Sequence, residues 1–239
     1  DKTMIDLKTW KPAVMTALKE AFGERLLCLG LQGSYLRGEA TADSDIDLLV
    51  VLDQVTIDDL DAFHAAMRSL PDGERAVGFT CGRAELAAWP AYELYQFEHG
   101  TEVWLGDLHP LLPEYDEDDI RLGARVSVAN LYHMVNHTYL TTRDLDETAL
   151  TDALKALLKA FFFSLQIVHA VRTGVFAPTK RQLLTELTDA DERTLLRHAM
   201  PSNTAMSTGK VKDGGDTTSD TLYRLLQAWC SRTLIDIRA

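Results

Sequence analysis

Two apolar segments, joined by a glycine-serine turn and an aspartate pair, constrain the fold of this chain more than any other feature. The apolar run at 26–31 is followed by Gly33 and Ser34, and a second apolar run opens with Asp45 and Asp47. Side chains alternate between the two faces of a strand, so Asp45 and Asp47 should point to the same face. The chain is therefore expected to place two carboxylates beside a glycine turn.

The aspartate pair and the glycine-serine turn together predict a site for a nucleoside triphosphate. Two same-face carboxylates repel each other, and a hard divalent cation between them relieves the repulsion. Mg²⁺ is the expected ion, because it takes one or two carboxylates together with substrate phosphate oxygens. Gly33 and Ser34 offer unhindered backbone N–H groups and a hydroxyl to those phosphates. We expect one or two Mg²⁺ ions at Asp45 and Asp47, with ATP as the substrate.

Composition bounds the size and the partners of the protein. The chain has 239 residues, 46% of them hydrophobic, which is enough for one large domain or two modest ones, and we expect two. Its net charge is −12, from 36 acidic and 24 basic residues. This balance argues against binding nucleic acid and favours small or cationic acceptors.

The cysteines and the apolar runs bear on the cellular compartment. Cys28, Cys81 and Cys230 are odd in number and far apart, so the sequence predicts neither a disulfide framework nor a zinc site. No apolar run approaches the roughly 18 uninterrupted residues of a membrane span, and the N-terminus shows no secretion signal. The expectation is a soluble cytoplasmic protein without a membrane partner.

The first half of the chain alternates helical and strand patterns. In chain order, we expect a helix over 9–23, strands over 26–31 and 45–52, a helix capped by Thr56 that ends near 71, a strand over 75–81, and short strands over 94–97 and 101–105 that could form a hairpin. These elements predict a mixed sheet with flanking helices, and the order of the last strands in that sheet stays open.

The second half shows only helical spacing. Apolar residues recur at helical intervals over 121–143, 149–173, 179–187, 191–199 and 220–237, whereas 201–219 is polar and is expected to be a mobile loop. Prolines and acids near residue 113 suggest a boundary there. The predicted fold class is α+β, with one domain over 1–113 and a helical bundle over 114–239.

The motif also carries a family resemblance. A strand, Gly-Ser, Arg37-Gly38, and then Ser44 to Leu48 leading into 49–51, resembles the signature of the DNA polymerase beta type nucleotidyltransferase superfamily, G-S-x-x-x-G near D-x-D. Such a domain followed by a helical bundle is similar to the bacterial antibiotic (aminoglycoside) adenylyltransferases. The resemblance implies a Mg²⁺-dependent enzyme that transfers a nucleoside monophosphate, AMP from ATP, to a hydroxyl of a small molecule such as an antibiotic.

The resemblance also implies roles for single residues. Asp45 and Asp47 would be the catalytic metal ligands, Gly33 and Ser34 would surround the β- and γ-phosphates, and Arg37 would add positive charge. The segment 167–180 resembles the family's helix, glycine turn and Pro-x-Lys stretch, in which the lysine reaches nucleotide phosphates. Lys180 is therefore a candidate phosphate ligand. The alternative is that Lys180 belongs only to the first turn of a surface helix.

One expected acid is missing. The family places a third carboxylate on the strand after the second helix, but the stretch 75–81 contains none. Without it the acceptor hydroxyl lacks a base. Glu98 is the first candidate substitute, and the others considered are Glu85, Glu93 and Glu102.

Two other functions stay open, the first of them because of the missing acid. One is a nucleotide-binding regulatory or antitoxin-like module with impaired catalysis, and the other is a protein AMPylase. The sequence leaves the oligomeric state undecided, so a homodimer or a toxin partner is also open.

Overall fold

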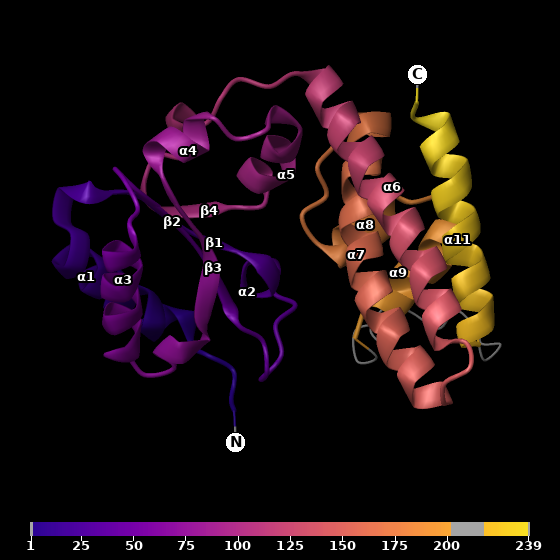
Figure 1. Ribbon diagram of the computed structural model, residues 1–239, viewed down its shortest axis with the longest axis horizontal. Coiled ribbons are helices and arrows are strands. Elements are labelled where there is room, and N and C mark those ends of the chain that lie inside the picture. The colour runs from indigo at the N-terminus through magenta and orange to yellow at the C-terminus, as the bar shows by residue number, and fades with distance from the viewer. Residues whose placement is uncertain (1, 202–217, 239) are drawn as a thin grey trace. The chain divides into compact units, whose positions relative to one another are not determined.

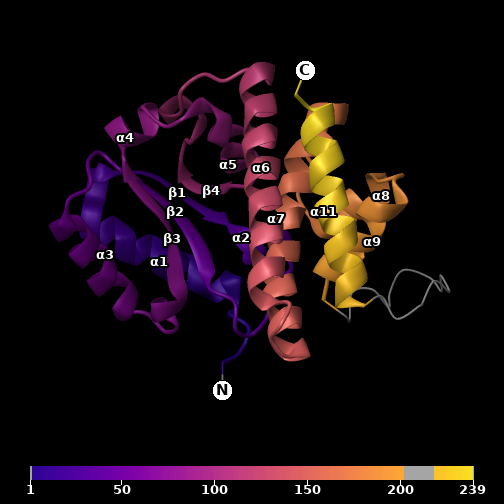
Figure 2. The same cartoon turned by 45° about the vertical axis from the view of Figure 1, so that its right-hand side comes forward.

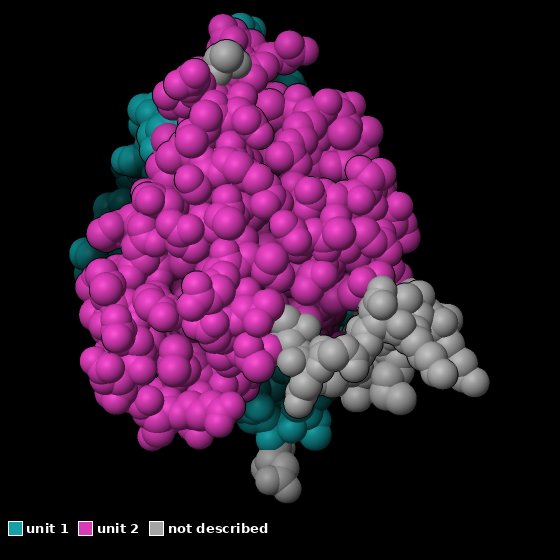
Figure 3. All heavy atoms as spheres, turned by 90° about the vertical axis from the view of Figure 1, so that its right-hand side faces the viewer, with its two compact units in different colours: residues 1–115 teal, residues 116–239 magenta. Residues whose placement is uncertain are grey.

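A computed structural model describes residues 2–201 and 218–238 of the chain (Figure 1, Figure 2). Most of the segment 201–219, expected to be a mobile loop, lies outside these residues. Contacts divide the chain into two compact units, Asp1–Tyr115 and Asp116–Ala239, which Figure 3 colours separately.

The first unit is a four-stranded mixed sheet with helices on both faces (Figure 1). Its elements are α1 (Leu7–Phe22), η1 (Gly23–Arg25), β1 (Leu26–Gln32), α2 (Gly33–Arg37), β2 (Ile46–Leu52), α3 (Ile57–Arg68), η2 (Gly73–Arg75), β3 (Ala76–Gly82), α4 (Arg83–Ala87), η3 (Ala91–Glu93), α5 (Leu94–His99), β4 (Glu102–Gly106) and η4 (His109–Leu111). The strand order is β3-β2-β1-β4. β1 is antiparallel to β2 and β4, whereas β2 and β3 are parallel.

Alternation along β2 sends its side chains into two separate cores. Ile46, Leu48 and Val50 pack with residues of α1 and α3 on one face of the sheet. Leu49 and Val51 pack on the other face, in a cluster that includes residues of α4. Asp47 has the same parity as Leu49 and Val51, so its side chain belongs to the face opposite α1 and α3.

One predicted strand is wrong. Residues 94–97 lie in the helix α5 and not in a strand, so the hairpin expected around residue 99 does not form. The helix brings residues four positions apart together: the rings of Tyr95 and His99 lie 4.3 Å apart, and the hydroxyl of Thr101 donates a hydrogen bond to the Phe97 carbonyl at 2.6 Å. A short apolar run is compatible with either element, and contacts of this kind decide between them.

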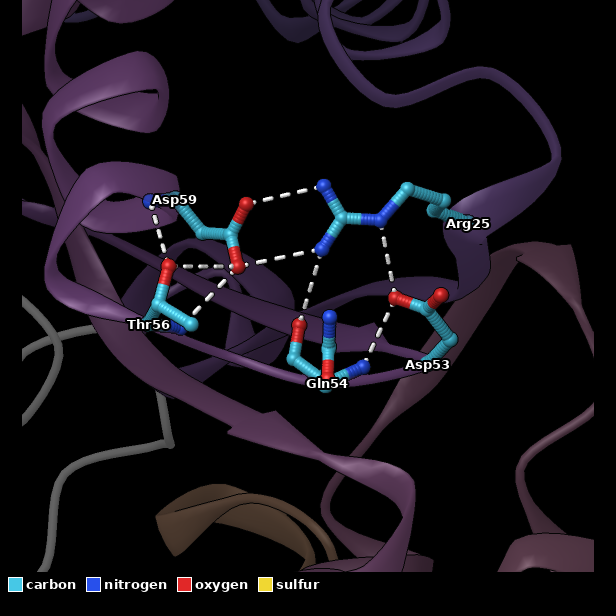
Figure 4. A network of polar contacts seen from close by, with 5 residues as sticks. All are labelled: Arg25, Asp53, Gln54, Thr56 and Asp59. Carbon is cyan, nitrogen blue, oxygen red and sulfur yellow. Dashed lines mark hydrogen bonds and ion pairs between the residues drawn. The ribbon is translucent and has the colours of Figure 1, made fainter.

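An arginine network ties β1 and β2 to the start of α3 (Figure 4). Arg25 donates to both carboxylate oxygens of Asp59, at 2.8 and 3.0 Å, and to Asp53 at 3.0 Å. Asp59 and Thr56 also form the capping box of α3. These hydrogen bonds, first of all those from Arg25, hold the pKa of Asp59 well below its usual range.

The Arg25 network predicts a pH-dependent loss of stability. A carboxyl whose pKa is lowered by folding stabilises the protein above its unfolded pKa, about 3.9, and loses that contribution as the pH falls below this value. Asp59→Asn should therefore lower the melting temperature at pH 7, and its difference from the wild type should shrink below about pH 4. Thermal melts of the wild type and of Asp59→Asn at several pH values between 7 and about 3 measure this difference. Asp61→Asn, an exposed acid of the same helix, should behave as the wild type.

The second unit is a helical bundle (Figure 2). Its helices within 116–201 and 218–238 are α6 (Glu117–Thr142), α7 (Glu147–Thr173), α8 (Lys180–Glu186), α9 (Ala190–Ala199) and α11 (Ser219–Asp236). Phe161 of α7 and Trp229 of α11 are fully buried, and their rings meet edge to face at 4.9 Å. The bundle and the mixed sheet confirm the α+β fold class.

Among the described helices of this bundle, α7 has the most buried residues. It is long and apolar enough to cross a membrane on length and composition alone, yet 67% of its most apolar 18-residue window is buried inside the structure. The core helix of a bundle has the same properties.

All three cysteines are free and buried in the two units. Burial raises the pKa of the Cys28 and Cys81 thiols to about 11 and that of Cys230 to about 12. The thiols therefore stay protonated at neutral pH.

Candidate nucleotide site

The start of α2 brings the glycine turn against the aspartate pair. β1 ends at Gln32, and Gly33 begins α2 with a left-handed φ of 74°. A Cβ atom at position 33 would lie 1.9 Å from Asp47 Oδ2. Only glycine therefore allows this approach, and the Asp47 carboxylate lies directly against the first backbone atoms of α2. We expected a simple turn at Gly33 and Ser34, and the structure has the short helix α2 instead.

Asp45 lies one residue before β2, in the loop that connects α2 to this strand. A tight turn shapes the loop, because Thr41 N donates to Ser44 Oγ at 2.8 Å and Ser44 N donates to the Thr41 carbonyl at 3.1 Å. Asp45 is exposed and Asp47 is half-buried. The two acids flank Ile46, which is fully buried on the α1 and α3 side. Strand alternation therefore directs Asp47 to the opposite side, and Asp45, one residue before the strand, is expected to follow it.

Arg37 is engaged within the motif itself. Its Nε donates to Glu39 Oε1 at 2.8 Å, and both side chains are largely buried, at 13% and 14% exposure. A phosphate that binds Arg37 would have to share the guanidinium with the Glu39 carboxylate. The negative charge of Glu39 partly cancels the positive charge that Arg37 presents to the phosphate. The role of Arg37 at phosphate stays a prediction.

The register of β2 and β3 shows which residue of β3 lies beside Asp47. Asp47 pairs with Val77 on the neighbouring parallel strand, and Val77 is 43% exposed. The next residue, Gly78, has a φ of 133°, and a Cβ atom there would lie 2.2 Å from the Leu48 carbonyl oxygen. The strand position beside the aspartates is therefore occupied by a valine, followed by a residue that must be glycine.

The substitute acids do not complete a metal site. Glu98 lies on α5 and accepts hydrogen bonds from Tyr115 at 2.6 Å, with His109 Nδ1 also 2.6 Å from its carboxylate. Burial and, after it, the Glu98 carboxylate raise the pKa of Tyr115. Across residues 2–201 and 218–238, no three His, Cys, Asp or Glu side chains form a group that could hold a metal. The structure therefore brings neither Glu98 nor Glu85, Glu93 or Glu102 to the aspartate pair as a third ligand.

Lys180 is the first residue of α8 in the second unit, where Thr179 caps the helix. The lysine is buried, at 9% exposure, and its ammonium lies 4.7 Å from the centre of the Phe162 ring. It is therefore not the exposed first-turn lysine of a surface helix. Its contact with phosphate stays a prediction.

Sequence reasoning missed one residue of this region, Arg75. It precedes β3, is 2% exposed and donates hydrogen bonds to the loop before Asp45. Its acceptors there are backbone carbonyls, which leave no signal in the sequence.

Comparisons with known proteins find a matching family model and a similar solved structure. Residues 14–81 match the family model described as "Nucleotidyltransferase domain", and this range includes β1, α2, β2 and most of β3. A search of curated proteins finds no match to this sequence. Among solved structures, the chain is similar to spectinomycin adenyltransferase AAD(9) from Enterococcus faecialis, determined with ATP and spectinomycin.

The structural likeness spans both chains. It covers 96% of this chain and 100% of the other, with a TM-score of 0.55 and 15% sequence identity. At this identity the likeness shows a shared fold, and the family match shows the kind of domain. Residues 14–81 of the N-terminal unit therefore match a nucleotidyltransferase domain, and this match together with the shared fold supports an enzyme of the nucleotidyltransferase kind.

Proposed function

We propose that this protein transfers AMP from Mg²⁺·ATP to a hydroxyl group of a small molecule, with an aminocyclitol or aminoglycoside antibiotic as the first acceptor class to test. The observation that carries the proposal is the close approach of Asp47 to Gly33, with Asp45 two residues before Asp47. All three residues lie inside the segment that matches the nucleotidyltransferase domain. The similar fold of an adenyltransferase determined with ATP and spectinomycin supports the choice of nucleotide and acceptor.

The residues present fit Mg²⁺. Proteins commonly hold this ion by one or two carboxylates together with substrate phosphates, and not by a dedicated cage of side chains. Asp45 and Asp47 supply two carboxylates, and the glycine at position 33 leaves room for Asp47 beside the backbone. Asp45 and Asp47 would hold the ion, and phosphate oxygens of the nucleotide would fill further positions.

The chemistry assigned to the site is an in-line displacement at the α-phosphate. The acceptor oxygen forms a new bond to phosphorus, the bond to the pyrophosphate oxygen breaks, and the hydroxyl proton passes to water, or to a carboxylate where one is in reach. Bound Mg²⁺ would neutralise triphosphate charge and polarise the attacking and leaving oxygens. Gly33 and Ser34 would donate hydrogen bonds to the phosphates and so fix the nucleotide in line with the acceptor.

A transfer assay tests the proposal. The purified chain is incubated with each of the four α-labelled ribonucleoside triphosphates, Mg²⁺ or Mn²⁺, and a panel of aminocyclitols, aminoglycosides and lincosamides. Label from ATP should appear on at least one acceptor, with release of pyrophosphate. Absence of label on every acceptor, together with tight metal-dependent ATP binding, would reject transfer to these acceptors.

That last outcome would support the second candidate function, nucleotide binding with little turnover. The observation that favours it is Val77, which occupies the strand position beside Asp47 where a carboxylate would serve the acceptor. Without a base, only water can take the hydroxyl proton at neutral pH, and transfer should be slow.

Lys180 is expected to contribute to nucleotide binding. Because its stem is buried beside Phe162, Lys180→Met keeps most of the packing while removing the charge. This variant should raise KM for ATP by about tenfold with a smaller change in kcat, as expected when a ground-state phosphate contact is lost. Steady-state kinetics with varied ATP measure it. Lys159→Met, on an exposed face of α7, is the matched control and should leave KM unchanged.

A further inference from the structure

Arg75 is a buried cation at the edge of the proposed nucleotide site. It is the last residue of η2, directly before β3, and only 2% of its surface is exposed. Its nearest recorded carboxylate oxygen, Asp72 Oδ1, is 3.9 Å from Nη1. The close partners of the guanidinium are instead neutral oxygens. A buried charge is costly unless such hydrogen bonds compensate it, so this arrangement is specific.

The neutral oxygens come from three separate segments of the first unit. Arg75 Nη2 donates to the carbonyls of Ala42 and Ser44, both at 2.7 Å, and to the Tyr35 hydroxyl at 3.2 Å. Nη1 donates to the Thr3 carbonyl at 2.7 Å. One side chain therefore joins the N-terminal segment, the short helix α2 that begins with Gly33, and the loop that leads into β2.

Two of these contacts bear directly on the aspartate pair. The Ser44 carbonyl belongs to the peptide group that joins Ser44 to Asp45, so the hydrogen bond from Arg75 orients the backbone on the N-terminal side of Asp45. On the C-terminal side, Ile46 begins β2 and is held by the sheet. Through the Tyr35 hydroxyl, Arg75 also holds α2 in place. The same hydroxyl accepts a hydrogen bond from the Ile5 N–H at 3.1 Å.

We propose that Arg75 is a positioning residue of the nucleotide site: it fixes the 42–45 loop against α2 so that the exposed carboxylate of Asp45 is held beside that of Asp47 before metal and nucleotide bind. This proposal rests on the proposed function for its effect on affinity. Its structural part, the ordering of the loop by Arg75, stands without any ligand.

The planar shape of the guanidinium is essential to this role. Lysine keeps the charge but offers one compact ammonium group, which does not span acceptors on three segments in the way the five-donor fork does. Arg75→Lys should therefore release the loop while leaving the net charge of the unit unchanged.

The chain contains a matched control in Arg25. This arginine also joins separate segments of the first unit, the stretch after β2 through Asp53 and the Gln54 carbonyl, and α3 through Asp59. It precedes β1, whereas Gly33 follows β1, so the length of the seven-residue strand, about 23 Å, separates it from the motif. Arg25→Lys therefore removes comparable hydrogen bonds at the other end of the sheet, and it shows what a general loss of stability does to the motif.

Two measurements on the full chain test the proposal. Hydrogen exchange without ligand should show faster exchange of peptides that contain 42–47 in Arg75→Lys, and wild-type rates there in Arg25→Lys. Titration with Mg²⁺·ATP should show an affinity loss on the order of tenfold in Arg75→Lys and none in Arg25→Lys, the size seen when a supporting residue behind metal ligands is removed. Melting temperatures of both variants are recorded alongside.

The outcomes separate the two proposals. Wild-type exchange over 42–47 in Arg75→Lys overturns the positioning role, whatever the affinity. Equal loss of affinity in both arginine variants also overturns it, because the effect would then follow general stability. If the wild type does not bind Mg²⁺·ATP, the proposed function fails, and exchange alone decides the role of Arg75.

A second variant covers the case in which Arg75→Lys does not fold. Tyr35→Phe removes one acceptor of the guanidinium and keeps the buried ring. It should give a smaller increase in exchange over 42–47 than Arg75→Lys would, and wild-type exchange there would overturn the proposal.

Discussion

Asp45→Asn and Asp47→Asn are each expected to reduce Mg²⁺-dependent ATP affinity, and any transfer, by about a hundredfold or more, because in the proposed site each would replace an anionic ligand of the ion by a neutral amide. The melting temperature should stay level or rise, since the substitution relieves repulsion between two carboxylates on one face. Calorimetric titration with Mg²⁺·ATP and a thermal melt of the same samples measure both effects.

Asp43→Asn is the matched control for the aspartate pair. Asp43 is exposed in the same loop, two residues before Asp45, and the substitution changes the net charge by the same amount. It should bind Mg²⁺·ATP as the wild type does. If Asp45→Asn and Asp47→Asn bind equally well, the metal site has been assigned to the wrong residues.

Val77→Asp is expected to strengthen metal binding by about tenfold or more. Val77 pairs with Asp47 across parallel strands and is 43% exposed, so a carboxylate there can reach the same face at little packing cost. A carboxylate a few ångströms from a divalent ion gains more than the roughly 1.4 kcal/mol that a tenfold change requires, even at an effective dielectric constant of about 20. Titration of Mn²⁺ in the presence of ATP measures the gain.

The same variant also reports on catalysis. If the chain turns over slowly because it lacks a base, Val77→Asp should raise kcat for transfer, whereas a chain that already uses a base from elsewhere should show no gain. Val103→Asp is the control, because Val103 is similarly exposed, at 39%, on the opposite edge strand β4. Equal gains in metal affinity from both variants would show a general charge effect and refute the location of the missing carboxylate.

The core elements of the first unit could be predicted because each has a local signal. The helix before residue 23 has buried residues at fourfold spacing, and the cap at Thr56 forms with Asp59 as its partner. The shared face of Asp45 and Asp47 is a prediction from strand alternation, and it stays a prediction because Asp45 lies one residue before β2. In the second unit, helical spacing alone indicated the bundle.

The features that could not be predicted have either an ambiguous local signal or partners in distant segments. The strand expected over 94–97 is a helix, and the sequence could not decide between them because an apolar run of this length fits both elements. The position of Val77 beside Asp47 depends on a register of parallel strands that a sequence does not specify. Arg75 has no local signature, because its partners are main-chain oxygens of residues 3, 42 and 44.

Each unit contains at least one buried cysteine whose reactivity can report when that unit unfolds. Cys28 and Cys81 lie in the sheet of the first unit, and Cys230 lies in the core of the bundle. Because a thiol reacts as its thiolate, these protonated side chains should resist alkylating reagents until their surroundings open. Alkylation followed by peptide mass analysis would therefore time the unfolding of the two units separately in one unlabelled sample. The order in which the thiols react would reveal which unit opens first.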